Sequence, residues 1–448
     1  MYADVSFPIS SFQVFSYRIP ENLATAASVG STVNAPLGKR IVSGIIVSCY
    51  SESKYSGKIK EITSIERGKP VLDGKLWKLI TWLSSYYDTP IGLAAKAVLP
   101  SQLSTSYEPK KQNFARALYS KSESNIKGST QIKVFNFLKS QNSPVPFSAL
   151  KIFSPNPSSI CNSLEKKGLI EIIQKPVIPN IYETSLDSEP KEINLTGDQQ
   201  KAISAISSSL DKNIFDPFLL HGVTGSGKTE VFIEAAKHAM NQNKSVVVLL
   251  PEISTTPQIA GRFKSVFGDS VAVWHSKLSK SSRAWIWKKI CNGDFKIIIG
   301  ARSAIFTPLK NLGLIIVDEE QENAYKQTSS SPKYHAKEVA LMRGKISKAT
   351  VILSSATPSI ETYFNYKSDK FKYLELPNRF GNAKLPEVHL VNMIDENKAT
   401  ENYDTIFSQL LLDKIEDRIK KNEQVILLHN RRGFAPILRC DDCGEISK

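Results

Sequence analysis

The chain has 448 residues, of which 41% are hydrophobic and 23% are charged, so it is long enough for about three ordinary globular domains and is neither disordered nor collagen-like in composition. It has no apolar run of the ~18–20 residues that a membrane span needs, no signal peptide at its start and only five scattered cysteines, which predicts a soluble protein of a reducing cytoplasm with no membrane partner. The formal net charge is +15, and residues 1–180 alone hold 22 basic and 11 acidic residues, a bias that favours nucleic acid as a partner, although solubility explains it equally well.

Residues 1–105 are expected to form a small β-rich domain. Two β-rich runs, at residues 29–35 and 41–48, flank a Pro-Leu-Gly turn. A helix is predicted at residues 76–87, because leucine and isoleucine recur there at helical spacing, and Pro90 is expected to end it.

Residues 110–180 have the pattern of a winged helix. An amphipathic helix at 131–138, a short element at 147–152 and a third helix at 157–167 precede a β-wing at 169–173. Such three-helix units often place their third helix on DNA. A module for packing or dimerisation remains the alternative that this pattern leaves open.

Between residues 190 and 376, short β-rich runs alternate with helical stretches. This rhythm is typical of a parallel α/β sheet. A second α/β unit is expected at residues 377–448, with a helix at 406–421 and a strand at 424–428. The strands predicted for the first unit are residues 218–220, 246–250, 297–299, 314–317 and 351–353.

A glycine-rich stretch at residues 222–229 has the pattern G-x-x-x-x-G-K-T between a predicted strand and a predicted helix. Its glycines permit a tight turn whose backbone N–H groups face phosphate oxygens, while Lys228 reaches the β- and γ-phosphates and the Thr229 hydroxyl ligates Mg²⁺. The helix that follows would present the positive end of its dipole to the anion. A glycine-rich turn without a ligand is the alternative, which this context disfavours.

Three carboxylates, Asp318, Glu319 and Glu320, follow an apolar run. They are expected at the carboxyl edge of the sheet, where parallel α/β sheets place their ligands. Asp318 is suited to hold Mg²⁺ and Glu319 to orient or deprotonate the attacking water. Most acidic pairs are solvated turns, but the phosphate loop upstream favours a catalytic pair here. No role is predicted for Glu320.

Further strings match motifs of superfamily 2 helicases in chain order: TGDQ at 196–199, LPEIS at 250–254, GARSA at 300–304 and SAT at 355–357. Together with GVTGSGKTEV, DEEQENAYKQ, SATPSIET and LLHNRRGFAPILRC, they resemble the primosomal protein N′ (PriA) family of replication-restart helicases. The strings FQVFSYRIPENL and WLSSYYDTPIG are similar to that family's domain for DNA 3′ ends. The resemblance implies a RecA-like motor lobe behind a 3′-end DNA-binding domain.

The resemblance implies ATP, Mg²⁺ and Zn²⁺ as cofactors. Gln199 would contact adenine, and Ser355 and Thr357 would couple the nucleotide state to the grip on DNA. The catalytic residues would be Lys228, Thr229, Asp318 and Glu319, with Thr229 and Asp318 on Mg²⁺. The phosphates would be held by Gly222, Val223, Thr224, Gly225, Ser226, Gly227, Lys228 and Thr229.

The resemblance also implies a monomer that binds forked and single-stranded DNA and DNA 3′ ends, tracks 3′ to 5′, and works with other primosome proteins and single-strand-binding protein. Arg302 and Ser303 would touch the tracked strand. In an aromatic-rich loop after the acidic pair, Tyr325 and Tyr334 would stack on bases and Lys326 would contact a phosphate; ordinary packing is the alternative for the tyrosines. The 3′-end pocket would use Phe15, Tyr17, Gly38 and Lys60.

Three positions depart from the family's usual residues. Ser16 stands where aspartate is usual, so a terminal hydroxyl would lose a charge-assisted hydrogen bond. Gln321 stands where a histidine is expected to link hydrolysis to DNA contact, so this coupling is expected to differ. Lys333 stands where arginine is usual, which removes bidentate phosphate recognition.

Cys440 and Cys443 form a C-x-x-C pair, which is half of a four-ligand zinc site. A redox pair is the alternative. Because the resemblance implies further cysteines and the rest of a second motor lobe, we expect the chain to be an N-terminal fragment with impaired turnover.

Three hypotheses follow for function. The favoured one is an ATP-driven DNA translocase that recognises branched replication forks and starts replication restart by primosome assembly. Another superfamily 2 motor, without a domain for 3′ ends, is the second. A nucleotide-gated scaffold that binds DNA without turnover is the third. An oligonucleotide with a blocked 3′ hydroxyl separates the first two.

Overall fold

In the computed structural model the chain divides into two units, residues 1–382 and 383–448. None of the described helices is long and apolar enough to cross a membrane. The residues that the structure describes are 1–52, 57, 59–65, 72–99, 111–118, 126, 128–141, 144–176, 194–251, 256–380, 386–400, 406–428, 438–439 and 446–447.

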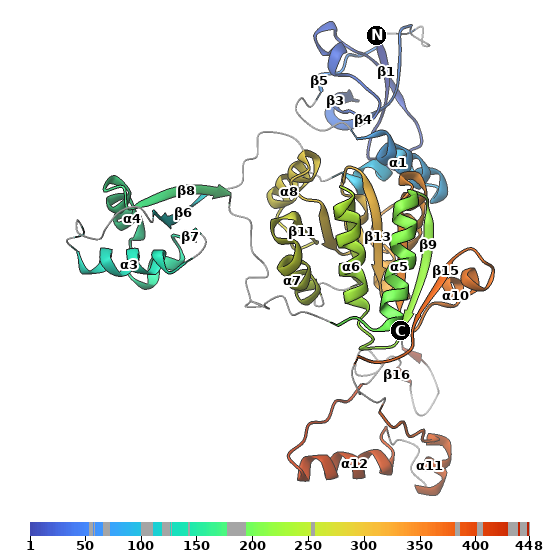
Figure 1. Ribbon diagram of the computed structural model, residues 1–448. Coiled ribbons are helices and arrows are strands. Elements are labelled where there is room, and N and C mark those ends of the chain that lie inside the picture. Colours follow the sequence, from blue (N-terminus) through green and yellow to red (C-terminus); the bar gives the residue numbers. More distant parts are fainter. Residues whose placement is uncertain are drawn as a thin grey trace. The chain divides into compact units, whose positions relative to one another are not determined.

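The first unit contains a seven-stranded sheet in the order β11-β12-β10-β13-β14-β9-β15, with every neighbouring pair parallel (Figure 1). This confirms the predicted parallel α/β motor lobe. The five inner strands coincide with the predicted ones, whereas the edge strands β11 and β15 are absent from the prediction because one is short and the other is half polar. The strands are Asp216–Gly222 (β9), Ser245–Leu249 (β10), Val271–Trp274 (β11), Ile297–Gly300 (β12), Leu312–Asp318 (β13), Thr350–Ser355 (β14) and Lys372–Leu376 (β15).

Helices cover both faces of this sheet, which explains why its inner strands are apolar without alternation. Val246 and Val248 of β10 pack toward α5, α6 and α7, which lie side by side in Figure 1, and Val247 and Leu249 pack toward α8 and α9. The turns η5 and η6 follow the ends of β12 and β13 at the sheet's carboxyl edge, where Asp318 ends β13. The helices of the lobe are Gly197–Lys212 (α5), Lys228–Asn241 (α6), Thr256–Phe267 (α7), Lys280–Asn292 (α8), Ala336–Ser347 (α9) and Ile360–Lys367 (α10), with 3-10 turns at Gly268–Ser270 (η4), Arg302–Phe306 (η5) and Asn323–Tyr325 (η6).

The N-terminal region begins with a five-stranded antiparallel sheet in the order β2-β1-β4-β3-β5. The predicted turn is formed at Gly38, whose φ of +63° lies in the left-handed region that glycine adopts without strain. The strands are Tyr2–Ser6 (β1), Phe15–Arg18 (β2), Thr32–Leu37 (β3), Arg40–Tyr50 (β4) and Ser64–Ile65 (β5), with a 3-10 turn at Glu21–Ala26 (η1).

Two further helices, α1 (Gly74–Tyr86) and α2 (Ile91–Val98), share one apolar core with α8, α9 and the motor sheet. The Asp73 side chain starts α1 by accepting a hydrogen bond of 2.6 Å from the backbone N–H of Leu76. Pro90, predicted to end the first helix, instead precedes α2. The helices α1 and α2 therefore pack on one face of the motor lobe, and the domain boundary at residue 105 stays a prediction.

Residues 111–176 form a module with a core of its own. The two longer predicted helices are present as α3 and α4, and the predicted β-wing is β8, which pairs with an unpredicted strand, β6. The winged-helix assignment stays a prediction. The elements are Lys111–Ala117 (β6), Ser129–Lys139 (α3), Val145–Pro146 (β7), Ala149–Ile152 (η3), Pro157–Lys166 (α4) and Ile170–Pro176 (β8).

The second unit contains helices α11 (Met393–Thr400) and α12 (Gln409–Lys420) and the antiparallel pair β16 (Leu438–Arg439) and β17 (Ile446–Ser447). The helix predicted at 406–421 is present, but the strand predicted at 424–428 is wrong, because these residues are irregular and exposed and pair with no strand in the described part of the chain. The zinc prediction on Cys440 and Cys443 lies outside the described residues.

Candidate nucleotide and DNA site

The phosphate loop connects β9 to α6 at the carboxyl edge of the motor sheet. Gly225 and Gly227 have φ values of +81° and +79°, in the left-handed region that the tight turn requires. The Ser226 hydroxyl inside the loop is buried and has no hydrogen-bond partner among the described residues. A buried hydroxyl without a partner is costly, and a bound phosphate oxygen would satisfy it.

Lys228 begins α6 and lies between the loop and the acidic pair. Its ammonium donates a hydrogen bond of 2.9 Å to the carbonyl of Gly222 and is 3.9 Å from Oε1 of Glu319. The loop and the carboxylates, 90 residues apart in sequence, therefore face each other at one edge of the sheet, as the sequence predicted.

Asp318, the last residue of β13, is 9% exposed. Burial raises the pKa of its carboxyl to about 6, the Glu319 carboxylate adds to this effect and the Lys228 ammonium opposes it. Its Oδ1 atom is buried and accepts no hydrogen bond among the described residues. A divalent cation would satisfy this oxygen and stabilise its charge, so Asp318 fits the predicted Mg²⁺ site, together with Thr229 in the first turn of α6.

Glu319 has a φ of +48°, a left-handed backbone conformation that costs a non-glycine residue about 1–3 kcal/mol at a functional site. Hydrogen bonds hold both of its neighbours in the chain, Asp318 and Glu320. The Tyr325 hydroxyl lies 2.5 Å from the carbonyl oxygen of Asp318 and 3.0 Å from that of Leu249, so the two carbonyls share its one proton, and the Glu320 N–H donates a hydrogen bond of 3.0 Å to the carbonyl of Ser354.

Gln321 connects the acidic pair to the predicted coupling residues. Its Nε2 donates a hydrogen bond of 2.9 Å to Glu319, and its Oε1 accepts one of 2.6 Å from the hydroxyl of Ser355. The Ser355 hydroxyl in turn accepts a hydrogen bond of 2.8 Å from the N–H of Thr357. An amide has both the donor and the acceptor that this connection needs, and the expected difference in coupling stays a prediction.

Gln199 supports the phosphate loop. Its Oε1 accepts a hydrogen bond of 2.8 Å from the Thr196 N–H, which makes a capping box for α5, and its Nε2 donates one of 2.9 Å to the carbonyl of Ser226. Both ends of the amide are therefore hydrogen-bonded within the protein. A contact with adenine stays a prediction and requires one of these bonds to be exchanged.

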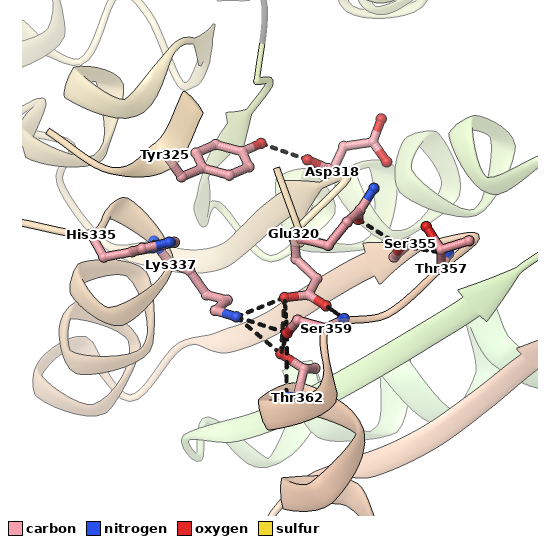
Figure 2. A network of polar contacts seen from close by, with 10 residues as sticks. Asp318, Glu320, Tyr325, His335, Lys337, Ser355, Thr357, Ser359 and Thr362 are labelled. Atoms are coloured by element: carbon pink, nitrogen blue, oxygen red, sulfur yellow. Dashed lines mark hydrogen bonds and ion pairs between the residues drawn. The ribbon is translucent and has the colours of Figure 1, made fainter. Parts of the chain in front are cut away.

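Glu320, which had no predicted role, lies in a buried polar network with Lys337, Ser359 and Thr362 (Figure 2). Lys337 was not singled out from the sequence. One signal in the sequence could have found it: Lys337 stands among apolar positions of a helix that packs on the sheet. A lysine at such a position indicates a buried partner of opposite charge.

The predicted base-stacking role of Tyr325 and Tyr334 is wrong for this structure. Tyr325 is 0% exposed and Tyr334 is 4% exposed, and the Tyr334 ring packs edge-on against Phe306 with 5.0 Å between centroids. Packing, the alternative left open, describes both rings. Lys326 is exposed and available for a phosphate, with its ammonium 5.7 Å from the centroid of the Tyr87 ring.

Arg302 and Ser303, predicted to touch the tracked strand, begin the η5 turn after β12 and are partly exposed. The Arg302 guanidinium donates hydrogen bonds of 3.3 Å and 3.0 Å to the carbonyls of Ala324 and Lys326. The structure therefore brings these residues together with the loop that follows the acidic pair.

The predicted 3′-end pocket is assembled only in part. Lys60 donates a hydrogen bond of 3.0 Å to the carbonyl of Gly38, and Phe15 is partly exposed beside Phe7. Tyr17 is a correction, because its ring is 3% exposed and its hydroxyl donates to a carbonyl in β3, so it cannot stack on a terminal base.

Ser16 lies beside a carboxylate that the sequence did not reveal. Its hydroxyl donates a hydrogen bond of 2.7 Å to Asp4 on the neighbouring strand, which also accepts bonds of 2.8 Å from Ser48 and 2.9 Å from Tyr50. A negative charge is therefore present next to the position where the family usually has aspartate.

Comparison with known proteins locates two families in this chain. Residues 4–100 match the family described as 3′DNA-binding domain (3′BD), and residues 196–365 match the DEAD/DEAH box helicase family. These ranges cover the antiparallel sheet with α1 and α2, and the parallel sheet with the site described above.

Replication restart protein PriA from Chlamydia pneumoniae is 37% identical over 456 residues, covering 100% of this chain and 60% of the relative. The protein of the same name from Bacillus subtilis (strain 168) is 31% identical over 517 residues, covering 99% of this chain and 64% of the relative. A solved structure of RecG bound to a three-way DNA junction matches with a TM-score of 0.34 and 22% identity, over 47% of this chain and 27% of that one. The chain thus spans under two thirds of the length of these relatives.

Proposed function

Because the chain belongs to the PriA family of replication restart proteins, we propose that it is the ATP-binding and DNA-binding part of a DNA helicase that acts in replication restart. The observation that carries the proposal is the approach of Lys228 to Glu319, 3.9 Å across the mouth of the phosphate loop. Nucleoside triphosphate hydrolysis uses such a pair, a lysine that reaches phosphate oxygens and a carboxylate that orients the attacking water.

Each residue at this edge has a proposed part. The loop from Gly222 to Thr229 holds the phosphates, and Lys228 neutralises the β- and γ-oxygens. Thr229 and Asp318 hold Mg²⁺, which supplies charge neutralisation at the phosphates when bound. Glu319 orients the attacking water and accepts its proton. Gln199 contacts adenine after it releases one of its present hydrogen bonds.

On the DNA side, Arg302, Ser303 and Lys326 contact the tracked strand, and the region of Phe15, Gly38 and Lys60 holds a DNA 3′ end. The match of residues 4–100 to a 3′DNA-binding domain supports the second assignment. We further propose recognition of forked DNA, 3′ to 5′ tracking, assembly with primosome proteins and single-strand-binding protein, and zinc bound through Cys440 and Cys443.

The proposal is tested by binding to a forked oligonucleotide with a free 3′ hydroxyl and to the same fork with that hydroxyl blocked by phosphate. We expect ATP to bind in the presence of Mg²⁺, and the free end to be bound about tenfold more tightly than the blocked end, because a pocket for the terminal hydroxyl cannot accommodate the phosphate. Fluorescence anisotropy measures both affinities. Equal binding of the two forks would indicate a superfamily 2 motor without a 3′-end site.

The raised pKa of Asp318 predicts a pH dependence for Mg²⁺ binding. The carboxyl has a pKa of about 6, and a proton and a metal ion compete for it. The apparent Mg²⁺ affinity with bound nucleotide is therefore expected to be level above this pKa and to fall by about tenfold per pH unit below it. Titrations with Mg²⁺ at pH values from 5 to 8, in the presence of a fluorescent ATP analogue, measure this affinity. The Asp318→Asn variant is the control and retains only the titration of the nucleotide itself; identical profiles would contradict the assignment.

A further inference from the structure

A buried ion pair lies next to the proposed catalytic site. The Lys337 ammonium is 2.8 Å from Oε2 of Glu320, and these residues are 8% and 1% exposed. The carboxylate also accepts hydrogen bonds of 2.7 Å from the Ser359 N–H and 2.9 Å from the Thr362 hydroxyl. Figure 2 shows Lys337 reaching Glu320, Ser359 and Thr362 at once, so the charges are neutralised and well hydrogen-bonded.

Lys337 lies just after residues 322–335, which form a closed segment that we call the 322–335 segment. It is closed by a β-bridge between Lys326, in its first part, and His335, at its end, and by a hydrogen bond of 2.8 Å that the Gln327 N–H donates to the Tyr334 carbonyl. Arg302 holds the carbonyls of its first part. A displacement of this segment therefore moves Lys337, which follows it by two residues at the start of α9.

The 322–335 segment and Lys337, which follows it, contact the chain on the two sides of Glu319. Before Glu319, the Tyr325 hydroxyl is hydrogen-bonded to the carbonyl of Asp318; after it, Lys337 is paired with Glu320 (Figure 2). Glu319 itself has a φ of +48°, a conformation that persists only while its surroundings hold it. Loss of either contact would let the backbone of Glu319 relax and move its carboxylate.

The network also reaches the residues that follow β14. Ser359 and Thr362 form the first turn of α10, two residues beyond Thr357, and the Ser359 hydroxyl caps that helix. The Glu320 carboxylate therefore holds the start of α10 next to the chain that follows Asp318 and Glu319. Stability alone does not call for a charge here, since apolar residues of the same volume often stabilise a core as well as a buried ion pair does.

We propose that Lys337 is a positioning residue for ATP hydrolysis, which holds Glu319 through Glu320 and transmits the position of the 322–335 segment to the acidic pair. The inference rests on the proposed function and adds to it a residue that couples DNA contact to the nucleotide site. The 322–335 segment carries the exposed Lys326 and is held by Arg302, both proposed DNA contacts.

The test compares three variants by thermal unfolding and by the affinity for a fluorescent, non-hydrolysable ATP analogue, with and without a saturating single-stranded oligonucleotide. Lys337→Met leaves the Glu320 carboxylate buried without its cation and is expected to lower the melting temperature by roughly 6–15 °C. The double variant Glu320→Gln/Lys337→Met removes both charges and is expected to recover most of that loss. Lys345→Met, on the exposed side of the same helix, is the matched control.

In the wild type and in the control, DNA is expected to change the affinity for the analogue by about tenfold, the usual range of coupling between two sites. In the double variant this ratio is expected to fall below about twofold, while the affinity without DNA changes by less than about threefold. A purely structural role would leave the ratio unchanged. If the double variant does not fold, Thr362→Val keeps both charges and is expected to lower the ratio at least twofold by removing one hydroxyl from Glu320.

The possible failures are distinguishable. A folded double variant with the wild-type ratio, or an unaltered ratio in Thr362→Val, overturns the role of Lys337 and leaves the proposed function standing. A wild type that binds the analogue and DNA without any mutual effect also overturns it, because there is then no coupling to transmit. A wild type that does not bind the analogue refutes the proposed function, and this inference falls with it.

Discussion

Replacing Glu319 with glutamine is expected to slow DNA-stimulated ATP hydrolysis by about 10²–10⁴-fold, the usual contribution of a general base. The amide has nearly the same shape as the carboxylate but cannot accept a proton from the attacking water. Its oxygen can still accept the hydrogen bond that Gln321 donates, so the local structure is expected to survive. Phosphate release per chain, with and without single-stranded DNA, measures the effect.

The matched control for this variant is Glu322→Gln, an exposed glutamate three residues further along the chain. It is expected to hydrolyse ATP at the wild-type rate. The affinity of Glu319→Gln for ATP is expected to stay within a few-fold of the wild type, since glutamine keeps the size of the side chain and the hydrogen bond with Gln321. Hydrolysis at an undiminished rate would remove Glu319 from the mechanism.

Replacing Lys228 with methionine is expected to weaken the binding of Mg²⁺-ATP by about 10–150-fold. The ammonium would make charge-assisted hydrogen bonds with phosphate oxygens, which contribute about 1.5–3 kcal/mol, and tenfold in affinity corresponds to about 1.4 kcal/mol. Among the described residues, this ammonium has the Gly222 carbonyl and the more distant Glu319 as partners. Its loss is therefore expected to change the melting temperature little, and equilibrium titration with a fluorescent ATP analogue measures the affinity.

Lys237→Met is the control, because Lys237 is an exposed residue of the same helix, α6, and forms an ion pair with Glu234 one turn before it. It is expected to bind ATP as the wild type does. An affinity of Lys228→Met equal to that of this control would show that residues 222–229 form a turn without a nucleotide, and the function proposed for the motor lobe would not hold.

The features that were predictable from the sequence are the local ones. The phosphate loop depends on a few neighbouring residues, and strands such as β10 and β13 are apolar runs because helices cover both faces of their sheet. The approach of Lys228 to Glu319 then follows from the rule that the carboxyl ends of parallel strands share one edge. The glycine-rich motif and the parallel sheet together were enough to predict the nucleotide-binding part of the site.

The features that were not predictable depend on contacts between distant segments. Nothing in the surroundings of Tyr325 in the sequence distinguishes a ring that stacks on DNA from one whose hydroxyl reaches the carbonyls of Leu249 and Asp318. Lys337, the partner of Glu320, lies 17 residues further along the chain, at the start of α9. Likewise the carboxylate beside Ser16 comes from a neighbouring strand, which only the pairing of β1 with β2 reveals.

The packing of α1 and α2 limits how the N-terminal region of such a protein can be exchanged by recombination in evolution. Their apolar side chains, among them Leu79, Ile80 and Leu83, fill one face of the motor lobe, and the Tyr87 hydroxyl accepts a hydrogen bond of 3.0 Å from the N–H of His335. A gene fusion that exchanged the whole N-terminal region would leave that face bare. A replacement would therefore have to supply a helix pair that fits this face as well as a sheet, because Ile45 of β4 lies in the same apolar core and the Gly92 N–H of α2 donates a hydrogen bond of 3.1 Å to the Ser6 hydroxyl.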